Sequence, residues 1–142
     1  MITIPGITEK SILRYFVTLN SGDFTDVAAL FTQDGVMYPP VDLPVRGRDA
    51  IASYLWEEAQ DIRVEPQEGM IQNLGEGKVR IEITGRAHTS WCSVNVMWLF
   101  ILNSKSEISE VSIKLLAAPQ DLLSLRPPHK RLDELPSIPN LL

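Results

Sequence analysis

The stretch TSWCSVNVMWLFILN, residues 89–103, contains a run from 94 to 102 in which only Asn95 is polar. Its β-branched and aromatic residues favour a strand over a helix, and the run is far shorter than the roughly 20 residues of a membrane-spanning helix. Because the apolar residues do not alternate with polar ones, we expect both faces of this strand to be covered. One face would meet the domain core, and the other would need a helix, a second protomer or an apolar ligand. Trp98 lies in the middle of the run, and its indole N–H needs an acceptor once it is buried.

The composition predicts one domain with a substantial core. The chain has 142 residues, of which 44% are hydrophobic, and a net charge of −5 without any long basic run. A nucleic-acid partner is therefore not expected. Cys92 is the only cysteine, which excludes an internal disulfide and a zinc site made of thiolates. The N-terminus lacks a basic segment followed by a long apolar one, so we expect no secretory signal and a cytoplasmic protein.

Upstream of the apolar strand, the pattern predicts three helices. Thr8 can cap a helix that runs to about residue 20, Asp23 can cap a short second helix, and a third is expected from Gly47 to about residue 62. Asp34-Gly35 predicts a turn before a brief strand. The apolar spacing of the first helix predicts a buried face composed of Ile12, Tyr15, Phe16 and Leu19.

The strands predicted on either side of the apolar run complete the fold. Residues 64–74 form a weak strand, 75–77 a hairpin turn, 78–89 a cleanly alternating strand and 108–116 the last strand. Helices gathered on one face of an antiparallel sheet predict an α+β domain, and a curved sheet would leave a cone-shaped apolar pocket beneath the helices. We expect a further short helix at 118–125, a domain spanning 1–125 and a proline-rich tail spanning 126–142.

Two side chains stand out as candidate functional groups. Tyr15 is either a core tyrosine or a hydroxyl that faces a pocket, where it and the Trp98 N–H could both donate to one carbonyl. Such a pair suits either an oxyanion site or an anchor for a keto ligand. Glu58 falls in the apolar stripe of the third helix, where it is either a face-edge glutamate in water or a carboxylate with a raised pKa. Phosphate loops, nucleophile elbows and metalloprotease motifs are absent from the sequence.

A set of short segments, in order along the chain, carries a family resemblance: LRY at 13–15, LN at 19–20, DF at 23–24, LFT at 30–32, DG at 34–35, PP at 39–40, EE at 57–58, ITG at 83–85, Trp98, Phe100, LN at 102–103, LLA at 115–117, Pro119 and LL at 122–123. From about Ile4 to Leu125, the chain resembles the C-terminal domain of the orange carotenoid protein, a member of the NTF2-like superfamily. The helical carotenoid-binding domain of that family is missing, so the chain resembles the stand-alone C-terminal homologues.

The resemblance implies a role for each matching residue. Tyr15 and Trp98 match the pair that binds the keto oxygen of a carotenoid ring. Glu58 matches a glutamate that pairs with an arginine of the missing helical domain, and Cys92 lies in a shortened connection where stand-alone homologues can form a disulfide between protomers. The apolar tunnel positions implied in this way are Ile62, Val64, Ile113 and Leu115, with Trp91 near the tunnel mouth.

The function implied by the resemblance is that of a carrier, not an enzyme. It would hold a keto-carotenoid (canthaxanthin or echinenone), transfer it to helical carotenoid-binding partners and quench singlet oxygen. A C40 carotenoid is roughly 30 Å long, whereas a domain of this size has a radius of gyration of about 14–15 Å, so a homodimer would share one carotenoid. The alternatives are an isomerase or cyclase, with Tyr15 as oxyanion donor and Glu58 as base, or a scaffold domain that only dimerises.

Overall fold

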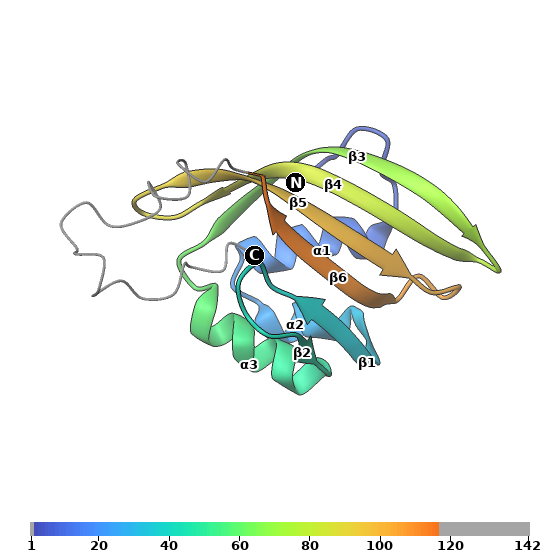
Figure 1. Cartoon of the computed structure of the whole chain (residues 1–142), viewed down its shortest axis with the longest axis horizontal. Helices are drawn as coiled ribbons and strands as arrows, with labels where there is room; N and C mark the ends of the chain where they lie inside the picture. Colours follow the sequence, from blue (N-terminus) through green and yellow to red (C-terminus); the bar gives the residue numbers. More distant parts are fainter. Residues whose placement is uncertain (1, 117–142) are drawn as a thin grey trace.

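A mixed six-stranded sheet with the strand order β2-β1-β6-β5-β4-β3 organises this computed structural model, in which residues 2–116 are described. The helices of the described residues all lie on one side of the curved sheet (Figure 1). The elements in chain order are α1 (Lys10–Asn20), α2 (Phe24–Ala29), β1 (Phe31–Tyr38), β2 (Val45–Arg46), α3 (Arg48–Glu58), β3 (Arg63–Gly75), β4 (Lys78–His88), β5 (Ser93–Leu102) and β6 (Ile108–Leu115). The α+β fold class predicted from the sequence is confirmed.

Strand pairing follows the predicted meander from β3 to β6, whose neighbours are all antiparallel. The pair formed by β1 and β6 is parallel, which the sequence did not predict. It arises because α3 and the meander separate β1 from β6, so the chain returns to β1 through a crossover rather than a hairpin. Strand β2 pairs antiparallel with the outer side of β1 and forms one edge of the sheet.

Strand β5 alternates in burial, so within residues 2–116 of one protomer only its inward face is fully covered. Its inward residues are buried, whereas Met97, Leu99 and Ile101 on the outward face remain partly exposed among residues 2–116. The apolar outward side chains made the sequence pattern look continuous, because hydropathy does not distinguish a buried position from a half-exposed one. The fully or almost fully buried inward residues of β5 are Val94, Val96, Trp98, Phe100 and Leu102.

Helix α1 buries the face predicted for it, but the start of α1 and the end of α3 differ from prediction. Helix α1 begins at Lys10 with Glu9 at its N-cap and without a side-chain cap bond, so the predicted cap at Thr8 is wrong by one residue. Helix α3 ends at Glu58 rather than near residue 62. The chain must become extended by Arg63, where β3 begins, so it turns over the intervening residues. The buried face of α1 contains the four predicted residues and Thr18.

The predicted turn at Asp34-Gly35 lies inside β1. The register of β1 against β6 shifts between Phe31 and Val36, which marks an irregularity where extra residues are accommodated. Gly35 is buried there, and a Cβ at this position would lie 3.0 Å from Phe31 side-chain atoms. The turn-forming residues therefore indicate a bulge, because a bulge and a turn both require backbone freedom.

A second irregularity bends β3 where it pairs with Gly85 of β4. The register shifts between Pro66 and Glu68, and the β3 backbone at Glu65 and Pro66 closes directly over Gly85. Such bulges increase the bend and twist of a sheet. The helix expected at 118–125 and the tail expected at 126–142 lie outside the described residues.

Candidate functional site

Four aromatic rings from α1 and β5 pack edge to face at the centre of the core. The Tyr15 ring lies 5.0 Å from Phe100 and 5.2 Å from Phe16, and the Phe16 ring lies 4.9 Å from Trp98. Edge-to-face packing places the positive edge of one aromatic ring against the negative face of the next, and this attraction holds each ring in a defined orientation. The two residues predicted to bind one carbonyl are thus brought into one aromatic cluster, joined through Phe16.

The Tyr15 hydroxyl is an unusual group within this cluster. Its oxygen is buried and has no hydrogen-bond partner among the described residues. Burial raises the pKa of Tyr15 well above the ordinary value of 10.0, so the hydroxyl stays protonated and remains a donor at neutral pH. A buried hydroxyl without a partner costs free energy, and native proteins rarely leave one without a reason.

The predicted tunnel residues surround this cluster at different depths. Val64 and Ile113 are each only 2% exposed, and Ile113 lies opposite Trp98 in the pairing of β5 with β6. Leu115 is partly buried and packs against the core. The side chain of Asn20 fixes the position of Val64, because its amide donates to the Val64 carbonyl at 2.8 Å and accepts from the Val64 N–H at 2.7 Å. No local sequence pattern predicts this link between α1 and β3.

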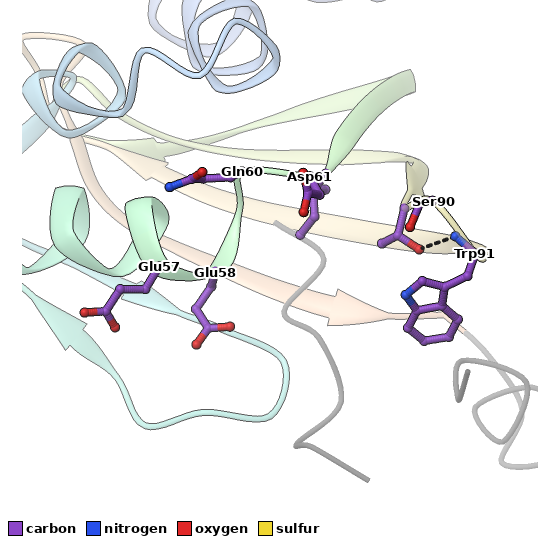
Figure 2. Close-up of a pocket in the computed structure, with 8 residues that line it drawn as sticks. Glu57, Glu58, Gln60, Asp61, Ser90 and Trp91 are labelled. Carbon is purple, nitrogen blue, oxygen red and sulfur yellow. Dashed lines mark hydrogen bonds between the residues drawn. The ribbon is translucent and has the colours of Figure 1, made fainter. Parts of the chain in front are cut away.

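A cavity of about 380 Å³ opens between the end of α3 and the turn that joins β4 to β5. Figure 2 shows Glu57 and Glu58 on the α3 side and Ser90 and Trp91 on the turn. Ile62 and Trp91, two of the predicted site residues, line this cavity, whereas Tyr15 and Trp98 do not. The lining residues are Glu57, Glu58, Gln60, Asp61, Ile62, Thr89, Ser90 and Trp91.

The entrance of this cavity is acidic. Glu57, Glu58 and Asp61 are all exposed, so Glu58 is a solvent-reaching glutamate at the edge of its helix face. Nearby on α3, Tyr54 donates a hydrogen bond of 2.9 Å to Asp42. Burial raises the pKa of Tyr54, and the Asp42 carboxylate and the charge of Glu58 raise it further. An acidic mouth attracts cationic groups and repels another acidic surface.

Cys92 lies in a tight turn at the same end of the sheet. The Thr89 N–H donates to the Cys92 carbonyl at 2.8 Å, and the Cys92 N–H donates to the Thr89 hydroxyl oxygen at 3.1 Å. The Thr89 hydroxyl also lies 3.3 Å from the Cys92 sulfur. Cys92 is a free cysteine whose side chain is partly buried against the core, and the residue before it, Trp91, lines the cavity.

Comparison with protein families identifies the fold. Residues 12–110 match the SnoaL-like domain. The chain belongs to the SnoaL-like family. This result confirms the NTF2-like fold predicted from the sequence. An epoxide hydrolase/cyclase-like enzyme of polyether salinomycin formation superposes with a TM-score of 0.60 at 18% identity, over 79% of this chain and 91% of that chain, which supports the fold alone.

More similar relatives of this SnoaL-like domain are orange carotenoid-binding proteins. The Synechocystis protein is 34% identical over 127 residues, which cover 87% of this chain and 40% of that protein. The Anabaena (Nostoc) orange carotenoid protein binding canthaxanthin superposes with a TM-score of 0.78 at 36% identity, over 86% of this chain and 40% of that chain. The SnoaL-like domain therefore spans about two fifths of these relatives, and the predicted resemblance is confirmed. In the described part of the chain, no helix is long and apolar enough to cross a membrane.

Proposed function

We propose that this SnoaL-like domain binds a keto-carotenoid and transfers it to a helical carotenoid-binding partner. Tyr15 and Trp98 hydrogen-bond the ring carbonyl, while Val64, Ile113 and Leu115 contact the apolar part of the ligand. Ile62 and Trp91 guide the polyene out through the cavity mouth. In this proposal the protein works in the cytoplasm and quenches singlet oxygen while it carries canthaxanthin or echinenone.

The observation that carries this proposal is the Tyr15 hydroxyl. It is a protonated donor in an aromatic, fully buried environment, without a partner among the described residues. A carbonyl on an otherwise apolar ring would satisfy it without introducing a charge into the core. The similarity to the canthaxanthin-binding protein of Anabaena (Nostoc) supports a keto-carotenoid as the source of that carbonyl.

The size of the cavity supports a shared ligand. A volume of about 380 Å³ lies at the lower end of ligand pockets and is too small for a whole C40 polyene. Because Tyr15 and Trp98 do not line this cavity, it would hold the part of the polyene that leaves the ring site. The exposed half of the ligand then needs a cover, which a second copy of the chain supplies in the carrier state. A helical partner replaces that copy during transfer.

The function is tested by producing the protein in cells that accumulate canthaxanthin or echinenone. We expect the purified protein to be coloured and to retain the pigment through size-exclusion chromatography. Incubation of this holo form with an apo helical carotenoid-binding protein should move the pigment to that protein. A colourless product from both kinds of cell, with the protein folded, would show that the proposed function is wrong.

Replacing either proposed donor should shift the absorption of the bound pigment. In Tyr15→Phe and Trp98→Phe, one hydrogen bond to the carbonyl is lost, which lowers the polarisation of the polyene and moves the band to shorter wavelength. Loss of one bond should weaken binding by about two- to twelvefold, because a hydrogen bond contributes about 0.5–1.5 kcal/mol net.

Tyr54→Phe is the matched control for this experiment. Tyr54 is a partly exposed tyrosine whose hydroxyl bonds to Asp42, so its loss should leave the spectrum unchanged. Absorption spectra and pigment titrations of the three variants measure the effect. Wild-type spectra in both donor variants would remove Tyr15 and Trp98 from the ligand site.

Cys92 is proposed to join two protomers when the cell becomes oxidising. Cys92 directly follows Trp91, which lines the cavity where two copies that share a ligand would meet. We expect mild oxidation to produce a covalent dimer on non-reducing gels and to slow pigment transfer, with both effects absent in Cys92→Ala. Formation of the disulfide requires Cα atoms within about 7 Å across the two-fold axis. An oxidised wild type that stays monomeric on the gel and transfers at the rate of Cys92→Ala would contradict this role.

The enzyme alternative receives less support from the geometry. A base and an oxyanion donor must reach the same substrate, but Glu58 lines the cavity mouth in water and Tyr15 is buried in the aromatic cluster. The enzyme superposed above shares only 18% identity with this chain, so it supports the fold and no shared chemistry.

A further inference from the structure

A short N-terminal segment, the strap (residues 4–7), lies on the inward face of the sheet. Ile4-Pro5-Gly6-Ile7 forms a tight turn in which the Ile7 N–H donates to the Ile4 carbonyl at 3.0 Å, and Gly6 adopts a φ of +82°. Pro5 and Gly6 are exposed, whereas Ile4 and Ile7 are only 3% and 5% exposed. The turn therefore directs two isoleucine side chains into the core.

Gly69 of β3 makes room for the strap. A Cβ at Gly69 would lie 2.5 Å from Ile7 Cγ1, 2.7 Å from Ile7 Cδ1 and 2.8 Å from Ile83 Cδ1. These distances are far below ordinary van der Waals contact, so the Ile7 side chain occupies the space that a side chain at Gly69 would take. Gly69 thus allows a close approach that any larger residue would prevent.

The strap lies at one end of a row of inward residues that includes Trp98. Gly69 pairs with Ile83, Ile83 pairs with Trp98, and Trp98 pairs with Ile113. Neighbouring strands are about 4.8 Å apart, so Ile7 lies roughly 10 Å from the β5 backbone, with Ile83 between them. A ring bound beside Trp98 would therefore meet Ile83 and Ile7 on its β3 side.

Side-chain packing alone holds the strap on the sheet. Within the described residues, its backbone hydrogen bond closes its own turn, and no hydrogen bond joins it to β3. Replacing Ile7 by a smaller residue would therefore open space beside Gly69 and Ile83. Such a change breaks none of the hydrogen bonds between the strands.

We propose that Ile7 forms the end wall of the site in which the carotenoid ring binds beside Tyr15 and Trp98, and that it fixes how deeply the ring enters. This inference rests on the proposed carotenoid binding. With the wall in place, the ring stops where its carbonyl meets the Tyr15 hydroxyl. Without the wall, the ring slides toward β3 and its carbonyl leaves the donor, so Ile7 is a positioning residue for the keto group.

The test combines a deletion of volume with its compensation. Ile7→Ala should shift the bound-canthaxanthin band to shorter wavelength and speed canthaxanthin release by about two- to twelvefold, the loss expected for one hydrogen bond. In Ile7→Ala/Gly69→Ala, the added methyl group enters the volume that Ile7 Cγ1 and Cδ1 vacate. The double variant should therefore return toward the wild-type spectrum and release rate.

The controls separate this inference from the function on which it rests. Near-ultraviolet circular dichroism confirms that each variant is folded, and Tyr15→Phe provides the spectrum of a chamber without the donor. If the wild type binds canthaxanthin, and Tyr15→Phe is blue-shifted while Ile7→Ala matches the wild type, the end wall is wrong and the proposed function stands. A double variant that releases canthaxanthin as fast as Ile7→Ala would also overturn the wall. A wild type that binds no pigment overturns the function itself.

Discussion

Replacing Gly85 with alanine is expected to cost at least about 3 kcal/mol of unfolding free energy, at or above the upper end of overpacking penalties. A Cβ at Gly85 would lie 2.8 Å from the Pro66 Cα and close to the carbonyl group of Glu65. These are backbone atoms, which cannot rotate away as the end of a side chain can. The bulge of β3 would have to open, and with it the bend between the two halves of the strand. Thermal and urea unfolding should show a midpoint lower by about 10 °C or more.

Gly22→Ala is the matched control for this substitution. Gly22 has a φ of +75° and no atom within 4 Å of an added Cβ, so alanine there meets only the conformational penalty of a left-handed backbone. That penalty is about 1 kcal/mol. Gly85 lies outside the left-handed region, so its effect would come from steric contact alone. Equal losses in the two variants would show that the β3 bulge opens easily and does not hold the sheet.

The sequence predicted the elements well because periodicity reports which face of an element is buried. Alternation in residues 78–89 and the apolar spacing of residues 12–19 both follow from one-sided burial, and both are confirmed. Periodicity does not predict the close contact at Gly85. This glycine occupies an ordinary inward position in an alternating strand, and no local pattern indicates that the backbone of Pro66, 19 positions earlier, lies directly against it.

The residue pattern alone suggested Tyr15 and Trp98 as candidate donors, and the resemblance added the tunnel positions. That the Tyr15 hydroxyl has no hydrogen-bond partner among residues 2–116 is a property of the packed core, which no local pattern predicts. Asn20 bonds to Val64, 44 residues away, and Ile7 packs against Gly69, 62 residues away. No local sequence pattern predicts either contact. The continuous apolar run of β5 does not show which of its faces the protomer itself buries, because its outward side chains are apolar but only partly buried within residues 2–116.

Binding of one carotenoid should hold two copies of the chain together at their cavity mouths. Native mass spectrometry of the holo form should show two chains and one pigment, and the dimer should dissociate when the pigment is removed. At a free pigment concentration 100-fold above its dissociation constant, linkage would stabilise the dimer by about 2.7 kcal/mol. A monomer that holds a whole carotenoid would contradict the shared chamber.

Charge gives this dimer a testable dependence on salt. The two mouths would bring Glu57, Glu58 and Asp61 of one copy toward the same residues of the other, and these like charges repel. Raising the ionic strength from about 0.01 M to 0.15 M shortens the screening length from about 30 Å to 8 Å, so association should tighten. Glu57→Gln/Glu58→Gln should tighten it at low salt and make it less dependent on salt. Sedimentation velocity of the apo and holo forms measures both effects.

Leu99→Glu distinguishes this arrangement from a dimer formed through the outer face of the sheet. Leu99 lies on the partly exposed outward face of β5, away from the cavity mouth, so a charge there should leave a mouth-to-mouth dimer intact. If Leu99→Glu abolishes the holo dimer while neutralising Glu57 and Glu58 has no effect, the copies meet through β5. In a mouth-to-mouth dimer, the same repulsion also favours transfer of the carotenoid. A helical partner with basic groups at its entrance would attract the acidic cavity mouth, whereas a second copy of the chain repels it.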